Sequence, residues 1–226
     1  MTASSQRGLR ADAARNHLRI VTAAIEKLES DGPAVALEDI AQHAGLGVAT
    51  LHRRFGKRED LIKAAAEHVF TEEIAPAVVE DGPDPWADLV ATITGTVQAF
   101  SRHSVLLSLA REHAVMGMDT MQAYNEAKER VVSRVREVGA IRPDLTAADL
   151  TAVVIMAFAI AQRTSDEFTA TNRHLTLLLD GMRPTGRPLP EQPRSTQHPD
   201  TPPIRSDQES GHPRPPARQT FQNRRS

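Results

Sequence analysis

The sequence predicts an all-α protein made of a small N-terminal helical domain, a larger C-terminal helical bundle and a tail that belongs to neither. Aromatic residues make up only 4% of the 226 residues, and the period-two alternation that is typical of strands is hard to find. Apolar residues instead recur every three or four positions between clear helix breaks. The last 43 residues contain 10 of the 15 prolines, which sets them apart from the rest of the chain.

Four helices are predicted in the N-terminal part. The first covers Arg15 to Asp31 and ends at the Gly32-Pro33 step, which is a typical helix stop. Two short helices follow, and a longer helix then runs to the Pro76 region. The ranges of these three are Leu37 to His43, Val48 to Phe55 and Glu59 to Ile74.

The sequence Asp81-Gly82-Pro83-Asp84-Pro85 is a strong break, after which the bundle helices begin. Thr146 with Asp149 three residues later forms a capping-box pattern, which fixes the start of one bundle helix. The five predicted helices are 86–102, 105–113, 119–138, 147–163 and 168–182. From Pro184 onward the composition favours disorder, because few large apolar groups are available to offset the entropy of ordering. The predicted domains are therefore 10–75 and 76–183, with a disordered, Pro- and Arg-rich tail at 184–226.

Composition excludes several kinds of site. The chain has no cysteine, so disulfides, thiolate zinc sites and cysteine nucleophiles are excluded. Residues 1–19 lack the apolar core of a secretory signal, and the apolar run at 152–161 is too short to span a membrane, so we expect a cytoplasmic protein. The net charge is -7 over residues 71–182 and +4 over 183–226, whereas residues 1–70 are nearly neutral. A nucleic-acid module is therefore expected near an end of the chain.

Residues 37–61 carry the most specific pattern. The apolar positions that face inward from the two short helices are Ile40, Ala41, Leu51 and Phe55. Gly45 supplies the turn between the helices. The second helix then presents four side chains outward, where a DNA major groove can receive them: Val48, Ala49, His52 and Arg53.

This pattern resembles the tetracycline-repressor (TetR) family over about residues 10–75. The matching segments are Asp39-Ile40-Ala41, Ala44-Gly45-Leu46, Thr50-Leu51, Phe55 and Arg58-Glu59-Asp60-Leu61. The resemblance implies a helix-turn-helix that contacts bases through Val48, Ala49 and His52. It implies phosphate contacts by Thr50, Arg53, Arg54 and Arg58, and Gly47 and Lys57 complete the predicted DNA-binding set. Independently, Thr50 lies near a helix N-terminus, where backbone N–H groups favour an anion.

Three positions depart from the common family pattern. Leu37 and Gly47 stand where many members have a capping hydroxyl, although glycine is an acceptable N-cap. His52 replaces the common tyrosine and keeps a ring with a hydrogen-bonding tip. Gly47 and the Arg58-Glu59 pair are similar to an SbtR-like branch of the family. The alternative for this window is a helical hairpin whose basic residues only solvate its surface.

The C-terminal domain offers weaker evidence for a small-molecule site. Its methionine and aromatic side chains are suited to an adaptable apolar pocket, although such residues are more often simply core. The proposed ligand-binding set is Trp86, Phe100, His103, Met116, Met121 and Tyr124. His103, Glu112 and His113 lack a metal-site spacing, so no metal and no cofactor is predicted. No nucleophile, phosphate-loop or paired-carboxylate motif is present, and no enzymatic activity is predicted.

The interpretation is a sequence-specific transcriptional regulator, a repressor that binds a palindromic operator as a homodimer and is released by a small-molecule effector. The family resemblance implies that 147–163 and 168–182 form the dimer interface. Their apolar residues exceed what one subunit's core needs: Leu150, Val153, Val154, Ala157, Phe158, Ala161, Phe168, Leu175, Leu178, Leu179 and Met182. The alternative is an all-α cytosolic ligand-binding or catalytic protein with an incidental helical hairpin at its start.

Overall fold

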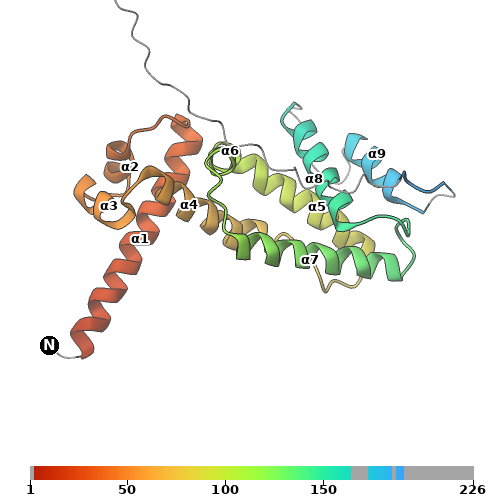
Figure 1. Cartoon of the computed structure of the whole chain (residues 1–226), viewed down its shortest axis with the longest axis horizontal. Helices are drawn as coiled ribbons and strands as arrows, with labels where there is room; N and C mark the ends of the chain where they lie inside the picture. Colours follow the sequence, from red (N-terminus) through yellow and green to blue (C-terminus); the bar gives the residue numbers. More distant parts are fainter. Residues whose placement is uncertain (1–2, 164–172, 185–186, 191–226) are drawn as a thin grey trace, which may run out of the picture. The chain divides into compact units, whose positions relative to one another are not determined.

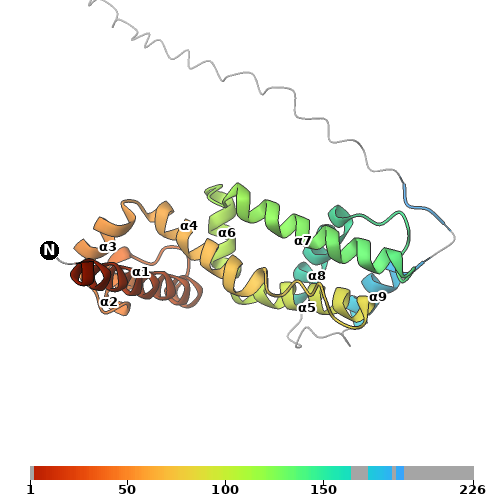
Figure 2. The ribbon, with the colours of Figure 1, turned by 90° about the horizontal axis from the view of Figure 1, so that it is seen from below.

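Helices account for all regular structure in the described part of the chain, as the sequence predicts. The structure is a computed structural model that describes residues 3–163, 173–184 and 187–190. Figures 1 and 2 show the helices from two directions. Their bounds are α1 Ala3–Asp31, α2 Leu37–His43, α3 Val48–Phe55, α4 Arg58–Val69, η1 Phe70–Ile74, α5 Pro85–Arg102, α6 Ser104–Glu112, α7 Met118–Glu137, α8 Ala147–Ala161 and α9 Arg173–Met182.

Helix α1 is the base on which the N-terminal helices pack. It contacts α2 and α4, and α3 contacts both α2 and α4. The side chains at the centre of this packing are almost inaccessible to solvent: Ile20, Ala24, Leu28, Ile40, Leu51, Leu61 and Ile62. Helix α1 begins at Ala3, twelve residues before the predicted start at Arg15. Most of the added residues are good helix formers such as alanine, but they have no apolar stripe from which a helix is recognised.

Helix α5 is the centre of the C-terminal bundle. It contacts α6, α7, α8 and η1, and the three helices α5, α7 and α8 lie together in both views (Figures 1 and 2). Leu89, Ile93 and Val97 recur every four residues along α5 and are completely buried. The predicted capping box of α8 is confirmed. The Thr146 backbone N–H donates to the Asp149 carboxylate at 2.8 Å, and the Asp149 backbone N–H donates to the Thr146 hydroxyl at 3.3 Å.

The helix predicted at Glu59 to Ile74 is α4 followed by one π-helical turn, η1. Such turns are rare and often occur at functional sites. Glu73 of η1 accepts a hydrogen bond from the His103 imidazole at 2.7 Å, and it forms an ion pair with Arg102 at 2.7 Å. The end of α5 is thereby tied to the end of α4.

Helix α6 connects the bundle to the N-terminal helices, because it contacts both α1 and α4. Its first backbone N–H groups are not capped by a neighbouring side chain. The Glu29 carboxylate of α1 instead accepts from the N–H of Leu106 at 2.8 Å and of Val105 at 3.2 Å. A carboxylate at a helix N-terminus is favoured by the helix dipole, so α1 stabilises the start of α6.

Arg142 holds the C-terminal end of the described bundle together. Its guanidinium forms an ion pair with Asp144 at 2.7 Å and donates to the Arg187 carbonyl at 2.7 Å. The Leu189 N–H donates to the same Asp144 carboxylate at 2.5 Å. The Arg142 guanidinium and the Leu189 N–H lower the pKa of Asp144. The rest of the predicted tail, 185–186 and 191–226, lies outside the described residues.

The helix predicted at 168–182 is described only from Arg173, so the predicted interface residue Phe168 lies outside the described residues. Within the described chain, no helix combines the length and the apolar character needed to cross a membrane.

Candidate nucleic-acid interface

A tight turn sets the angle between α2 and α3. Gly45 has a left-handed backbone with φ of 64°, and its N–H donates to the Gln42 carbonyl at 2.9 Å. The Leu46 N–H donates to the Ala41 carbonyl at 2.9 Å. This pair of hydrogen bonds is the Schellman motif, which satisfies the last carbonyls of α2 and turns the chain sharply. The sequence predicted this role for Gly45.

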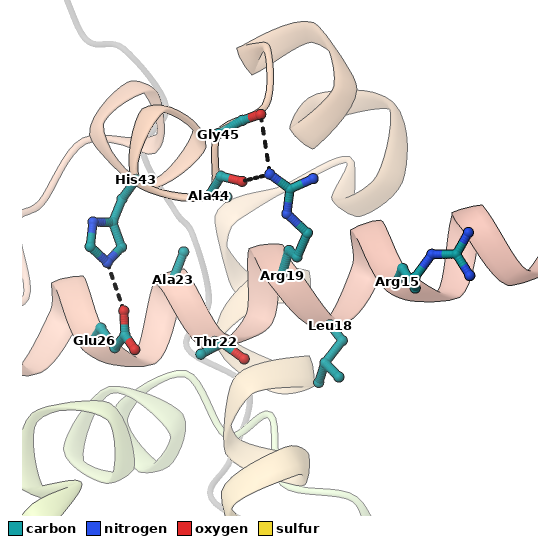
Figure 3. A pocket seen from close by; sticks show the side chains of 9 residues that line it. All are labelled: Arg15, Leu18, Arg19, Thr22, Ala23, Glu26, His43, Ala44 and Gly45. Atoms are coloured by element: carbon teal, nitrogen blue, oxygen red, sulfur yellow. Dashed lines mark hydrogen bonds and ion pairs between the residues drawn. The ribbon is translucent and has the colours of Figure 1, made fainter.

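Arg19 of α1 holds the turn from outside (Figure 3). Its guanidinium donates to the Ala44 carbonyl at 2.7 Å and approaches the Gly45 carbonyl at 3.4 Å. Beside it, His43 contacts Glu26 of α1 at 2.6 Å. These residues line an open surface hollow of about 560 Å³, and sequence reasoning did not identify Arg19 because the α1 pattern reports only its apolar stripe.

Helix α3 has two distinct faces. Leu51 and Phe55 are buried against the other N-terminal helices, as predicted. Ala49, His52 and Arg53 are exposed. Two of the three predicted base-reading residues, Ala49 and His52, therefore lie on the side of this eight-residue helix opposite the packing residues. The third, Val48, is partly buried and packs against the core.

The N-terminus of α3 is open. Its N-cap residue is Gly47, with an extended backbone and no side chain that could accept from the first N–H groups. An added Cβ at Gly47 meets no atom within 4 Å. Helix N-termini with free N–H groups attract anions, and Thr50 lies one turn into the same helix. Helix α2 is also without a side-chain cap, and its N-cap is Ala36 rather than Leu37.

A second hollow of about 240 Å³ lies between α1 and α3. The predicted phosphate-contacting residues Thr50, Arg53 and Arg54 line it, together with Asn16 and His17 of α1. No local sequence pattern indicated the two α1 residues, because their proximity to α3 depends on how the helices pack.

His17 connects this hollow to the core of the domain. Its ring stacks on Phe55 with 5.1 Å between ring centroids, and its Nδ1 accepts a hydrogen bond from the Arg54 guanidinium at 3.3 Å. Burial, followed by the charges of Arg54 and His68, lowers the pKa of His17. The neutral ring is therefore favoured, which agrees with its acceptor role.

Lys57 and Arg58 complete the predicted basic edge, but their surroundings differ. Lys57 is exposed, whereas Arg58 is partly buried. The Arg58 guanidinium donates to the Val35 and Pro33 carbonyls, both at 2.7 Å. It therefore joins the start of α4 to the loop before α2, and its predicted phosphate contact stays a prediction.

The six predicted ligand-binding residues lie in different surroundings. Trp86 and Phe100 are 14 positions apart on α5, about 21 Å along the helix axis. The Arg183 guanidinium carbon lies 3.4 Å from the centre of the Trp86 ring, and Phe100 packs edge-on against Phe158. The His103 imidazole is hydrogen-bonded to the Glu73 carboxylate.

Met116 and Met121 line a shallow hollow of about 510 Å³ with the exposed Met118, and Tyr124 is buried in the bundle with its ring edge-on to Phe70. A ligand role for these six residues stays a prediction. No group of His, Cys, Asp or Glu suited to hold a metal ion occurs among the described residues.

Two family models match this chain. The model for "Bacterial regulatory proteins, tetR family" matches residues 20–65, which include both faces of α3. The model for "Transcriptional regulator SbtR-like, C-terminal domain" matches residues 85–184, which begin at the first residue of α5. The chain belongs to the TetR family. The second match also agrees with the SbtR-like branch that the sequence indicated.

Relatives of this TetR-family chain share its architecture. The repressor LfrR of Mycolicibacterium smegmatis is 28% identical over 117 residues, which are 51% of this chain and 61% of that protein. The match therefore spans less than two thirds of the length of LfrR. A TetR regulator structure from Streptomyces coelicolor is 27% identical, with a TM-score of 0.51 over 75% of this chain and 99% of that one.

Two further solved structures show the same fold at lower identity. A TetR regulator from Mycobacterium vanbaalenii has a TM-score of 0.57 at 21% identity, over 77% of this chain and 99% of that one. LfrR from Mycobacterium smegmatis, solved in complex with proflavine, has a TM-score of 0.56 at 23% identity, over 76% and 98% of the two chains.

Proposed function

We propose that this protein is a transcriptional regulator that reads a DNA operator through α3. The single observation that carries the proposal is the two-faced α3. Leu51 and Phe55 anchor it, while Ala49 and His52 stand exposed beside its open N-terminus. Phosphate contacts by Thr50, Arg53, Arg54, Lys57 and Arg58 position the helix, and the outward residues at its start select the base pairs. The proposal includes no catalytic step.

The proposed active form is a homodimer, because α8 carries two apolar stripes. One stripe is buried inside the subunit and consists of Leu150, Val153, Val154 and Ala157. The other is exposed and consists of Ala152, Ile155, Met156 and Ala159. An exposed apolar stripe of this length on a helix is suited to bind a second copy of itself.

The proposed regulation is release from DNA by a small molecule bound in the helical bundle. LfrR has been solved in complex with proflavine, which supports a small-molecule effector for this chain as well. The two N-terminal domains of the dimer can adopt an arrangement that fits the operator and one that does not. The ligand shifts the population toward the second arrangement, and repression is relieved. Because its target is DNA, the proposed place of action is the cytoplasm.

Operator binding is the test of this proposal. Fragments of the DNA that flanks the gene are titrated with the purified full chain, and binding is followed by fluorescence anisotropy and by footprinting. We expect a protected palindrome and a loss of affinity for Arg53→Ala. Arg111→Ala, an exposed arginine on α6, is the matched control and should bind as wild type does. If no fragment is protected, the regulator proposal fails and the ligand-binding alternative gains support.

A further inference from the structure

A lysine ammonium group is buried in the bundle without a counter-ion among the described residues. Lys128 of α7 is only 4% exposed. Its Nζ donates to the Thr151 hydroxyl of α8 at 2.6 Å and lies 4.7 Å from the centre of the Tyr124 ring. The ion pairs formed among the described residues do not include Lys128.

The other buried Asp, His and Arg side chains in the described bundle have partners of complementary charge. Asp88 contacts the Arg134 guanidinium, and Arg142 contacts Asp144. His103 contacts Glu73. Lys128 is the exception. A buried charge is costly unless it is paired. The lack of a carboxylate next to Lys128 therefore sets it apart from the other buried charged groups.

The hydrogen-bonding capacity around Lys128 is not used up. An ammonium group has three donors, and Thr151 accepts only one of them. The Thr151 hydroxyl donates its own proton to the Ala147 carbonyl at 3.0 Å, so it is held as an acceptor for Lys128. Burial lowers the pKa of Lys128. The cationic form of Lys128 therefore gains from any further acceptor that enters the bundle.

A second buried polar group lies in the same part of the bundle. The Thr96 hydroxyl of α5 is completely buried and has no hydrogen-bond partner of good geometry. It lies close to the Tyr124 phenol: burial raises the pKa of Tyr124, and a side-chain hydrogen bond with Thr96 partly lowers it. Tyr124 therefore lies between the Thr96 hydroxyl of α5 and the unused donors of Lys128 on α7. Buried polar groups with spare hydrogen-bonding capacity are rare in folded proteins.

We propose that Lys128 receives the anionic group of the effector, and that the effector is a small, mostly apolar organic acid. This inference rests on the proposed function, because it names the chemistry of the molecule that enters the bundle. The carboxylate takes the free donors of Lys128, and the hydroxyls of Thr96 and Tyr124 lie within the same cluster. The edge-on ring pair of Tyr124 and Phe70 offers an apolar surface for the rest of the molecule.

The charge of the domain limits the ligand further. Residues 71–182 carry a net charge of -7, which repels molecules with several negative charges. One buried ammonium compensates one carboxylate. The inference is therefore specific for a monocarboxylate rather than a polyphosphate or a dicarboxylate.

Calorimetry on the full chain tests this inference without DNA. The probes are octanoate and benzoate, each with its neutral amide, octanamide and benzamide, which match them in shape but not in charge. We expect wild-type protein to bind at least one acid about tenfold or more tightly than its amide, because a charge-assisted hydrogen bond is lost in the amide. Lys128→Met should abolish that preference, and Lys128→Arg should retain part of it. Lys63→Met, an exposed lysine on α4, is the control and should keep it.

The outcomes separate the two proposals. Equal affinity of wild type for acid and amide, a preference that survives Lys128→Met, or no binding of either acid at millimolar concentration overturns the role of Lys128. Thermal unfolding of Lys128→Met, together with the partial rescue in Lys128→Arg, distinguishes loss of the site from loss of the fold. Operator binding without ligand is measured separately, so failure of the regulator proposal is recognised by loss of DNA binding in the wild type. In wild-type protein, an acid that binds should also weaken operator binding.

Discussion

At the scale of single residues, the two arginines at the ends of the predicted basic edge have different tasks. Arg53 is exposed on α3, whereas Arg58 donates to the two carbonyls at Val35 and Pro33. Arg53→Ala should leave stability unchanged, lower affinity for all DNA sequences and reduce the salt slope by about one unit. Arg58→Ala should lower the free energy of unfolding by about 1 to 2 kcal/mol, because charged hydrogen bonds to backbone are lost.

Denaturant titrations and anisotropy at several salt concentrations distinguish the two residues. A stability loss in Arg53→Ala, or none in Arg58→Ala, contradicts this division. Arg58 also shows the limit of sequence reasoning at this scale. Its type and position predict a phosphate contact, which stays a prediction. Its backbone partners lie 23 and 25 positions away, and no local pattern reports them.

Gly45 is required for a reason that can be tested directly. Its φ of 64° is unfavourable for residues with a side chain, and an added Cβ would lie 2.8 Å from the Arg19 guanidinium. Gly45→Ala should lower the free energy of unfolding by about 1 to 2 kcal/mol from backbone strain alone. Gly47→Ser is the matched control, because its Cβ meets no atom within 4 Å. Urea denaturation that shows equal stability for Gly45→Ala and wild type would argue against the strained turn.

His17 makes the stability of the folded protein depend on pH, with a known sign. Burial and the neighbouring charges of Arg54 and His68 lower its pKa, so the unfolded chain binds a proton at higher pH than the folded chain. The contribution of neutral His17 to stability is complete above about pH 6.5 and is lost as the pH falls through the lowered folded pKa. His17→Phe keeps the ring on Phe55 but does not titrate.

The comparison of these two proteins isolates the effect of His17. As the pH is lowered from about 7 to about 5, wild type should lose stability relative to His17→Phe. Unfolding by urea at several pH values measures this difference. Parallel pH profiles for the two proteins would contradict the lowered pKa.

At the scale of helices, the start of α6 depends on a residue 76 positions earlier. Glu29 accepts from the Val105 and Leu106 N–H groups and takes the place of a local cap. Glu29→Ala should lower the free energy of unfolding by about 1 to 2 kcal/mol, as for the loss of a helix cap, and Glu29→Gln should lose less. Glu112→Ala removes an exposed carboxylate at the other end of α6 and should have little effect. Equal stabilities for the Glu29 and Glu112 variants, measured by thermal unfolding, would refute the capping role.

The helix ends that the sequence predicted well are those marked by a capping or turn residue at the end itself. Gly45 ends α2, and Thr146 with Asp149 begins α8, so these bounds agree with the structure. The start of α1 and the π-helical turn η1 have no such signal. Their extents depend on helix propensity without an apolar stripe and on packing against α5, which a single sequence does not display.

At the scale of the whole molecule, the sequence predicted the helix α8 correctly but assigned some of its residues wrongly to a dimer surface. The sequence assigned the excess apolar residues of this helix to a dimer interface, including Leu150, Val153 and Ala157. These residues are buried inside the subunit. Because α8 is apolar on all sides, its pattern cannot distinguish the inner stripe from the outer one. The exposed stripe that includes Ile155 and Met156 is available to a partner, and Leu177 of α9 is exposed as well.

The assembly prediction is therefore revised to this outer stripe. Ile155 is 58% exposed, and in the proposed homodimer it is buried against the second copy. Ile155→Asp should convert the dimer to a folded monomer, because a buried carboxylate without a partner opposes association. Val138→Asp is the matched control, since Val138 is 60% exposed at the end of α7 and lies outside the proposed interface. Ala157→Asp should instead unfold the subunit, because Ala157 is completely buried within it.

Sedimentation equilibrium and circular dichroism on the three variants separate these outcomes. A folded Ile155→Asp monomer should also lose most of its affinity for a palindromic operator but retain weak binding to a single half-site. Two heads must span half-sites about 34 to 36 Å apart on the same DNA face, and only the dimer fixes that distance. A wild-type monomer at micromolar concentration, or an Ile155→Asp dimer that still binds the full operator, would place the association surface elsewhere than on the outer stripe of α8.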